Sequence, residues 1–560
     1  MNIKKQYVLL LISIALVMLP NVLLIIIGED SVVDSTIKKL VYLVFTTSII
    51  LLPLVFFKPR IFVWISFVLC PLLFFEVFNI NLFKAPSTII AVASLYYTNY
   101  GEATELLSSY GRYIILLTIT IAIHLYLLLK INSKFKLPKL LKRSILFGSA
   151  LVLIGIFTRD IFIAKNTLQE VKSFKTLINK AQVFYTVKLE KTFPVGLYIK
   201  HKNARIGIEL LSGYKERVKN FKFNAIREKN ISEPEIYILV IGETARKHNF
   251  GLYNYHRNTT PNLDTISNLI TFKNVKSSGN FTAITIPHIL TRATPNNDSI
   301  KYLEPAILNT FKEAGFKTYW LSNQPIGIGG VFGFYTSLAD QYKNLSVSFD
   351  VSDFDEELLP YIDEVLKENV LKKFIIIHTA GSHFRYNLRY PETFNKFKPS
   401  LRKGLSLDNN SIALKEKLVN SYDNSILYSD YILSTFIEKL NKQNVISSLY
   451  YISDHGENLY DDENEYLLHG FGIPTKYEIE VPLFIWNSDK YIKTFPSKDS
   501  ILKSNVYKRI SSINSFHTLL DIAAIKYPEE KLNRSFVNKT FDSLRTRYLL
   551  KTDKTVIKLD

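Results

Sequence analysis

Two apolar stretches of the chain end in residues that bind metals or carry out acid–base chemistry. Residues 236–241 lead to Glu243, and residues 449–453 lead directly to Asp454 and His455. Unbroken β-branched and aromatic runs are typical of buried strands in a parallel sheet, and ligands bind at the carboxyl ends of such strands. Two carboxylates and one imidazole suit zinc and leave a coordination position open for a reacting group. The pattern therefore predicts a catalytic metal site.

Three other segments carry hydroxyl groups and histidines. Residues 278–287 read SGNFTAITIP, residues 378–391 read HTAGSHFRYNLRYP, and residues 453–470 run from SDHGEN to LLHG. Each residue type is common by chance, so the prediction depends on finding all of them after strands. A helix cap is the alternative for Glu243 taken alone, because Thr244 could open a helix.

The elements that must position these residues alternate between strands and helices. Strands are predicted at residues 236–241, 317–321, 374–378, 449–453 and 481–486, and helices at residues 303–314, 356–369 and 415–440. Repeated alternation is typical of an α/β domain with a mainly parallel sheet covered on both faces. We expect this domain to span residues 233–560.

The composition indicates a membrane part joined to a soluble part. Hydrophobic residues make up 47% of the 560 residues, whereas charged residues make up only 21%. The one cysteine, Cys70, excludes an internal disulfide. The formal net charge of +19 fits an anionic partner, either membrane lipid or nucleic acid. Because no zinc-finger spacing or RNA-binding motif is present, we expect membrane lipid and no nucleic acid.

Apolar runs fill the N-terminal part of the chain. They cover residues 8–27, 40–57, 61–82, 113–129 and 145–164. Each approaches the ~20 residues needed to cross a ~30 Å hydrocarbon core, so we predict an all-α transmembrane domain of five helices over residues 1–164. A cleaved signal peptide is the alternative for the first run, although that run is long and no small-residue cleavage site follows it. Helices of a large globular core are the alternative for all five.

Charged residues between the runs predict the orientation. Basic residues gather before the first run and in alternate loops: Lys4, Lys5, Lys58, Arg60, Lys134, Lys136, Lys139, Lys142 and Arg143. The positive-inside rule places this side in the cytoplasm. Five spans then place everything after residue 164 outside, which is the periplasm of a Gram-negative cell. Residues 165–232 mix basic with apolar residues, which favours an amphipathic bridge on the bilayer surface; a solvated linker helix is the alternative.

Six motifs follow one another in the C-terminal part of the chain. They are IGETARKHNFGLYNYHRNTTPNL at residues 241–263, FTAITIP at 281–287, WLSNQ at 320–324, GSHFRYNLRYP at 381–391, SDHGEN at 453–458 and LHG at 468–470. In this order they resemble the membrane-bound phosphoethanolamine transferases of Gram-negative bacteria, within the alkaline phosphatase and sulfatase superfamily. The five-span layout is similar too. The WLSNQ and RYNLRYP forms look most like members that modify the lipopolysaccharide core.

This resemblance implies a metal site and a nucleophile. The residues that match the family's zinc ligands are Glu243, Asp454 and His455. Thr282 stands where the family has its nucleophilic threonine, which also contacts the metal. Thr285 and, more weakly, Thr244 are the alternatives.

The resemblance also implies substrate contacts. His383 and His469 match histidines that contact substrate or a second zinc, and either could protonate the leaving oxygen. Packed core histidines are the alternative for both. Thr98 and Glu102 resemble a Thr-x-x-x-Glu that lies near the lipid substrate in relatives, with ordinary surface residues as the alternative.

The function implied by the resemblance is transfer of phosphoethanolamine from phosphatidylethanolamine to a lipopolysaccharide acceptor, through an ester on threonine. One zinc ion is expected, and the family pattern allows a second. The expected protein is a monomeric, multi-pass enzyme of the Gram-negative inner membrane with its catalytic domain in the periplasm.

Three other functions compete with this one. A glycerol-phosphate transferase of the lipoteichoic-acid synthase type would share the five spans and the site, but not the GSH and WLSNQ motifs. A sulfatase of the main class needs a cysteine or serine to convert to formylglycine, which Thr282 cannot provide. A non-catalytic membrane scaffold would not need the complete ligand set.

The chain departs from the family pattern near the nucleophile. It lacks the relatives' disulfides, and Ser278-Gly279-Asn280 stands where many lipid A-modifying members have a glycine-flanked cysteine. Residues 324–330 also lack the basic residue of some relatives. These departures leave the acceptor open among lipid A, a core heptose or Kdo, a glucan and a protein.

Overall fold

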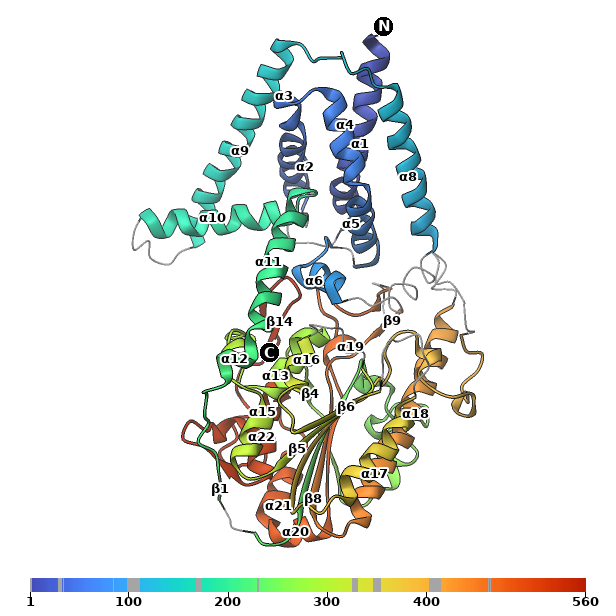
Figure 1. Ribbon diagram of the computed structural model, residues 1–560, viewed down its shortest axis with the longest axis vertical. Coiled ribbons are helices and arrows are strands. Elements are labelled where there is room, and N and C mark those ends of the chain that lie inside the picture. The colour runs from blue at the N-terminus through green and yellow to red at the C-terminus, as the bar shows by residue number, and fades with distance from the viewer. Residues whose placement is uncertain are drawn as a thin grey trace. The chain divides into compact units, whose positions relative to one another are not determined.

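Apolar helices and an α/β sandwich form two separate units in the computed structural model (Figure 1). The first comprises Met1–Tyr96, Tyr110–Ile206 and Phe471–Ile473, and the second comprises Tyr97–Ser109, Gly207–Gly470 and Pro474–Asp560. The structure describes residues 3–28, 33, 35–83, 85–97, 111–167, 174–228, 231–324, 331–345, 354–401, 414–461, 463 and 465–560.

The first unit is helical because long apolar runs leave no other way to satisfy the backbone in lipid. Its helices are α1 (Ile3–Ile27), α2 (Thr36–Leu51), α3 (Pro53–Phe56), α4 (Pro59–Val68), α5 (Cys70–Phe83), α6 (Ile89–Tyr97), α8 (Gly111–Lys130), α9 (Lys139–Thr167), α10 (Phe174–Glu190) and α11 (Val195–Ser212). Within the described residues, four segments are long and apolar enough to span a membrane: Ile3–Ile27, Thr36–Phe56, Tyr113–Lys130 and Lys139–Ile163.

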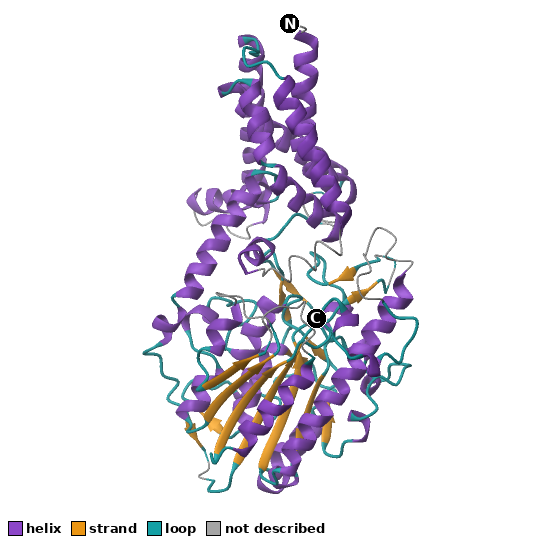
Figure 2. Cartoon of the chain, turned by 45° about the vertical axis from the view of Figure 1, so that its right-hand side comes forward, coloured by secondary structure: helices purple, strands orange, loops and turns teal. Residues whose placement is uncertain are grey.

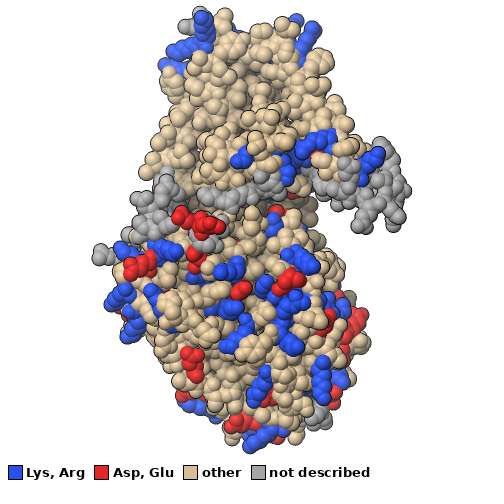
Figure 3. Space-filling model, turned by 180° about the vertical axis from the view of Figure 1, so that it is seen from behind, with Lys and Arg blue, Asp and Glu red and all other residues tan. Residues whose placement is uncertain are grey.

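A fifth segment is bent. Helices α4 and α5 meet at an angle of 57° and together pass the same test for a membrane span. Pro71 lies in the first turn of α5, where its missing N–H and its ring prevent α4 from continuing straight. This agrees with the predicted five runs. The face seen in Figure 3 has Lys and Arg at the ends of this unit and uncharged side chains between them.

The described part of the predicted bridge is mostly helical, with β1 (Ile226–Arg227) near its end. The described part of residues 165–232 contains the end of α9, then α10, α11 and α12 (Tyr214–Val218). Lys139, Lys142 and Arg143, which the sequence pattern assigned to a loop, lie in the first turns of α9.

A seven-stranded sheet forms the centre of the second unit (Figure 2). Its strands, in spatial order, are β3 (Leu269–Thr271), β11 (Leu483–Asn487), β8 (Ile446–Ser453), β2 (Glu235–Gly242), β7 (Lys372–His378), β5 (Lys317–Ser322) and β6 (Gln341–Asn344). The strands from β8 to β6 are parallel to one another, whereas β11 and β3 are antiparallel to their neighbours. The prediction of a mainly parallel α/β sheet is confirmed.

The register of the central strands brings their carboxyl ends to one level. Gly242 of β2 pairs with Ser453 of β8, and Ile241 pairs with His378 of β7. The residues that follow these three strands therefore converge at one edge of the sheet, as ligand-binding residues do in α/β folds.

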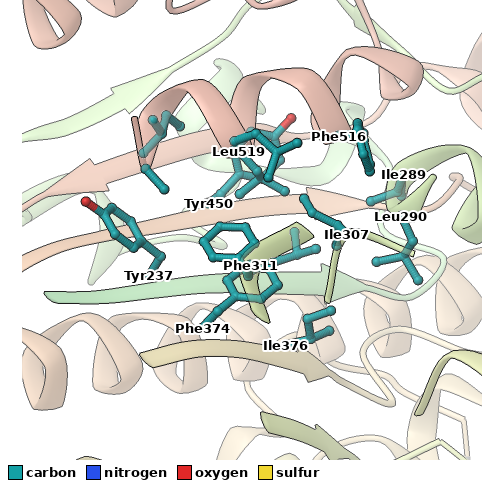
Figure 4. Packing of buried hydrophobic residues seen from close by; sticks show 14 of the residues in the cluster. Tyr237, Ile289, Leu290, Ile307, Phe311, Phe374, Ile376, Tyr450, Phe516 and Leu519 are labelled. Carbon is teal, nitrogen blue, oxygen red and sulfur yellow. The ribbon is translucent and has the colours of Figure 1, made fainter. Parts of the chain in front are cut away.

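Alternate residues of β2 enter two different cores. Tyr237 and Leu239 belong to the core formed with α13 (Thr282–Leu290), α15 (Ile307–Glu313) and α22 (Ser515–Ile522). Figure 4 shows this core, in which the Phe311 and Phe374 rings stack with their centroids 3.7 Å apart. Ile238 and Val240 enter the opposite core, with α17 (Leu359–Lys367) and α18 (Lys415–Lys442). Burial on both faces explains the unbroken apolar sequence of the strand.

Shorter elements complete this unit. They are α14 (Ile300–Leu303), α16 (Val331–Thr336), α19 (Lys476–Ile479), α20 (Asp489–Thr494), α21 (Pro496–Ser504) and the strand pairs β1 (Ile226–Arg227) with β13 (Ile525–Lys526), β4 (Val275–Lys276) with β12 (Ile510–Ser511), β9 (Asn458–Leu459) with β10 (Leu467–Leu468), and β14 (Tyr548–Leu550) with β15 (Val556–Lys558). The helix predicted at residues 303–314 is broken into α14 and α15, because Pro305 cannot donate a helical hydrogen bond.

Gly242 tests the packing at the end of β2. A Cβ at this position would lie 2.4 Å from the Tyr451 hydroxyl and within 2.9 Å of two atoms of its ring. We expect Gly242→Ala to lower the free energy of unfolding by about 1–3 kcal/mol, as other overpacked cores do. Thermal unfolding of the detergent-purified chain measures this.

Gly207→Ala is the matched control, because nothing lies within 4 Å of a Cβ built at this helical position. It should leave the chain as stable or raise its stability by about 0.5–1 kcal/mol. Equal effects of the two substitutions would contradict the close approach at Gly242.

Candidate functional site

Three residues predicted as metal ligands meet where β2 and β8 end. Ligand atoms of Glu243, Asp454 and His455 all lie within 4.8 Å of one another, and all three side chains are buried. The amide of Asp454 donates to the Gly242 carbonyl over 3.0 Å, which holds the two strand ends together. The sheet thus brings Glu243 and Asp454, which lie 211 positions apart in the chain, into one cluster.

Both oxygens of the Glu243 carboxylate accept hydrogen bonds. Oε1 accepts from the Thr244 hydroxyl over 2.7 Å, and Oε2 accepts from the Gln324 side-chain amide over 3.2 Å. The same Gln324 nitrogen lies 2.8 Å from the carbonyl oxygen of Thr379. Gln324 was not predicted as a site residue, although it ends the WLSNQ motif two residues after β5.

Asp454 and His455 each keep one atom available for a cation. Asp454 Oδ1 accepts from the amides of Thr244 and His455, over 3.0 and 2.7 Å. Its Oδ2 accepts no hydrogen bond from the described residues. His455 Nδ1 lies 2.9 Å from the Gly456 carbonyl, to which it can only donate. The lone pair of the neutral ring is therefore on Nε2, as a metal ligand requires.

The electrostatics of this cluster call for a positive charge. Burial raises the pKa of the Glu243 carboxyl well above its ordinary value, and the neighbouring Asp454 carboxylate raises it further. Burial also lowers the pKa of His455 to about 4, so its imidazole is neutral at pH 7 and cannot offset two carboxylates. A divalent cation bound by these three residues would supply the missing charge, and their N and O donors suit zinc.

Thr282 places a hydroxyl against this cluster. Its Oγ1 lies 2.9 Å from His455 Nε2 and 3.3 Å from Glu243 Oε1. Thr282 is the first residue of α13 and is partly exposed, so the positive end of the helix dipole would favour an anionic oxygen there. Thr285, one turn later, is buried and contacts the Phe281 carbonyl and Ser277 instead. The geometry therefore favours Thr282 as the nucleophile.

His469 lies beside His455, with the two ring centroids 4.0 Å apart. Its Nδ1 is 3.1 Å from Oε1 of Glu457, a fully buried carboxyl whose pKa burial raises to about 8. Glu457 was not predicted as a site residue, although it belongs to the SDHGEN motif. Since it holds Nδ1, the Nε2 face of His469 is left for substrate.

The remaining predicted residues differ in how they are placed. The backbone of Ser382 donates to the Glu243 carbonyl over 3.0 Å, which brings the His383 loop to the cluster. Burial lowers the pKa of His383 well below its ordinary value, and Arg389 and His469 lower it further. His378 is buried at the end of β7, near Trp320. Thr98 and Glu102 lie outside the described residues.

One buried carboxylate joins the loops around Thr282. Glu478 Oε1 accepts from the Asn280 side chain over 2.9 Å and from the Gly470 amide over 2.7 Å. Its Oε2 accepts from the amide of Thr475 over 2.8 Å. The loop that precedes Thr282 and the loop that carries His469 therefore share one anchor.

Comparison with known proteins identifies relatives of this chain. The family model described as Sulfatase matches residues 235–525. Phosphoethanolamine transferase EptC of Escherichia coli strain K12 is 29% identical over 467 residues, which are 80% of this chain and 77% of that protein.

Two solved structures are similar to this chain, one to part of it and the other to most of it. The zinc complex of the C-terminal periplasmic domain of EcEptC from Escherichia coli is 30% identical with a TM-score of 0.54, and covers 60% of this chain and 95% of that one. The integral membrane lipooligosaccharide phosphoethanolamine transferase A of Neisseria meningitidis has a TM-score of 0.71 at 20% identity, and covers 94% of this chain and 97% of that one. The latter likeness extends the shared fold to the helical unit.

Zinc binding should release a proton. Burial and Asp454 raise the pKa of Glu243 in the metal-free protein, so the cation must displace a proton wherever that carboxyl is still protonated. The apparent affinity should therefore rise with pH over the range in which that carboxyl is protonated, by up to about tenfold per pH unit for one displaced proton. Calorimetry at pH 7 in two buffers with different protonation enthalpies counts the protons released.

Glu243→Gln is the control for this measurement. The amide cannot release a proton and is a poorer ligand, so zinc occupancy and activity should fall together. Normal zinc content with full activity in this variant would contradict the assignment of Glu243 as a ligand.

Glu457→Gln should lower kcat about 10–100-fold with little change in KM, because His469 loses the carboxyl group that orients it and exchanges a proton with it. The amide has nearly the same volume, so zinc content and the thermal midpoint should stay close to those of the unmodified chain. An unchanged kcat would show that His469 does not need this partner.

Proposed function

The chain belongs to the sulfatase family, and on that premise we propose that it transfers phosphoethanolamine from phosphatidylethanolamine to a lipopolysaccharide acceptor. The proposed intermediate is a phosphoethanolamine ester on Thr282, formed at a zinc site. The relatives described above are phosphoethanolamine transferases, and the motif resemblance points to the same reaction.

One observation carries the proposal. The Thr282 hydroxyl lies within 3.3 Å of both Glu243 and His455 while one side of the residue remains accessible. A nucleophile of covalent catalysis needs this arrangement, with an activating centre on one side and substrate on the other. The homologous EptC domain was solved with zinc, which supports zinc as the cation for Glu243, Asp454 and His455. One ion accounts for these three ligands.

The first step breaks the bond between phosphorus and the diacylglycerol oxygen. Zinc held by the three ligands would stabilise the alkoxide of Thr282 and neutralise charge on the phosphoryl oxygens. Thr282 releases its proton to solvent and attacks phosphorus in line with the leaving oxygen. Burial raises the pKa of Glu457 to about 8, so near neutral pH its carboxyl can pass a proton to Nδ1 of His469 while the Nε2–H of that ring gives its proton to the leaving oxygen. Diacylglycerol then departs. His383 is the alternative donor.

The second step reverses these roles. A hydroxyl or phosphate of the acceptor gives its proton to the same histidine and attacks phosphorus, and the Thr282 oxygen leaves. Phosphoethanolamine is thereby moved to the acceptor, and the Thr282 oxygen takes a proton from solvent, which restores its hydroxyl for the next cycle.

A lipid donor explains why the catalytic unit is joined to apolar helices. We propose a transmembrane domain at residues 1–164, an amphipathic bridge at residues 165–232 and a periplasmic catalytic domain at residues 233–560, in the inner membrane of a Gram-negative bacterium. The four apolar segments and the bent α4–α5 pair support five spans. Thr98 and Glu102 are proposed to contact the lipid, and the working unit is proposed to be a monomer.

Peptide mass spectrometry tests the covalent step. Protein purified from a Gram-negative membrane should carry a phosphoethanolamine adduct within residues 280–287, and Thr282→Ala should abolish both the adduct and activity, the latter by at least about 1,000-fold. Stopping the reaction in acid without acceptor favours accumulation of the ester.

Thr285→Ala is the matched control within the same peptide. It should keep the adduct on Thr282, because Thr285 contacts Phe281 and Ser277 rather than the cluster. Loss of the adduct in this variant alone would make Thr285 the nucleophile. A glycerol-phosphate adduct would replace the proposed function with that of the lipoteichoic-acid synthase type.

A further inference from the structure

Thr244 adopts a backbone conformation that its residue type disfavours. Its φ is +58°, in the left-handed region, where the branched Cβ of threonine meets the neighbouring backbone. Among the described residues with positive φ, Thr244 is the one with a β-branched side chain. Such strain persists only where the surroundings enforce it, and it concentrates at functional sites.

The backbone amide and the side-chain hydroxyl of Thr244 each contact a carboxylate of the cluster. The Thr244 hydroxyl donates to Glu243 Oε1 over 2.7 Å, and the Thr244 amide donates to Asp454 Oδ1 over 3.0 Å. Thr244 is completely buried, so water cannot replace either bond. A single residue therefore joins the two carboxylates whose separation defines the metal site.

Tyr422, on helix α18, holds the strained turn at Thr244 through two hydrogen bonds. The Tyr422 hydroxyl on α18 donates to the Thr244 carbonyl over 2.7 Å and accepts from the Arg246 amide over 2.9 Å. Tyr422 is itself buried, with its ring against Tyr386 at a centroid distance of 5.1 Å and an interplanar angle of 88°. The hydroxyl thus bridges the residues on both sides of Ala245.

We propose that Thr244 is a positioning residue that sets the spacing of Glu243 and Asp454 for the cation, and that Tyr422 is the clamp that maintains its strained conformation. The inference rests on the proposed function, because it takes Glu243 and Asp454 as metal ligands. It assigns to Thr244 a role that needs both its hydroxyl and its left-handed backbone, and it excludes Thr244 as the nucleophile.

Zinc affinity separates the hydroxyl from the shape of the side chain. The full chain, purified in detergent and stripped of metal, is titrated with zinc in competition with a chelating dye of known affinity. Thr244→Val keeps the branched shape without the hydroxyl and should weaken zinc binding at least about tenfold. Thr244→Ser restores the hydroxyl and should return the affinity to within about threefold. Wild-type affinity in Thr244→Val would overturn the proposal.

The stability of the metal-free protein tests the strain. Thr244→Gly and Thr244→Ala both lack the hydroxyl, but only glycine adopts φ of +58° without cost. The glycine variant should therefore unfold at a higher temperature than the alanine variant while both bind zinc weakly. Equal unfolding temperatures would show that the turn is not strained, and would overturn that part of the proposal.

Tyr422→Phe tests the clamp without removing the buried ring. It should weaken zinc binding several-fold, with kcat falling more than KM rises. Tyr428→Phe is the matched control, because Tyr428 lies on the same helix and its hydroxyl accepts from the Glu356 amide instead. Equal effects of the two variants would refute a specific role for Tyr422.

The two levels of the proposal fail in different ways. If the unmodified chain binds no zinc, the proposed function fails, and the inference about Thr244 fails with it. If the unmodified chain binds zinc and both Thr244→Val and Tyr422→Phe bind it equally well, only the positioning role is wrong.

Discussion

Two carboxylates buried side by side are the constraint on which the site depends. Glu243 and Asp454 are buried away from water, and two negative charges placed side by side repel each other strongly in a medium of low polarity. Each arrangement around them reduces that cost. The Thr244 hydroxyl and amide, the Gln324 amide and the backbone of His455 all donate to the two side chains. Donors alone do not neutralise the pair, which is why the cluster suits a divalent cation.

The central sheet brings the two carboxylates and their hydrogen-bond donors together. Strands β2, β7 and β8 are parallel and in register, so the segments that follow them begin at one level. Burial of both faces of β2 fixes the position of its carboxyl end, because its alternate side chains are packed in two separate cores. Loops can then carry the chemistry while the strands define the distances. Thr282, the proposed nucleophile, comes from a different kind of element, the first turn of α13, where the helix dipole favours an anion.

Much of this fold could be predicted from local patterns. The apolar strands, the long helix at residues 415–440 and the apolar runs were identified because periodicity and length are local properties. The cluster of Glu243, Asp454 and His455 was predicted because these residues follow strands. Gln324 and Tyr422 were not, since a buried amide or hydroxyl signals its partner only once the tertiary fold is known. The left-handed turn at Thr244 was hidden for a related reason: threonine is a residue that local propensity argues against there. The break at Pro305 was a local signal that the helical pattern around it obscured.

The anchor formed by Glu478 has a consequence for redox chemistry. The resemblance described above places a glycine-flanked cysteine near the nucleophile in many relatives, where this chain has Asn280 bonded to Glu478. The chain's one cysteine lies far away in sequence, at residue 70. Hydrogen bonds therefore hold the loop before Thr282, and such bonds need no oxidant to form. The position of this loop therefore does not depend on the oxidants or reductants around the protein.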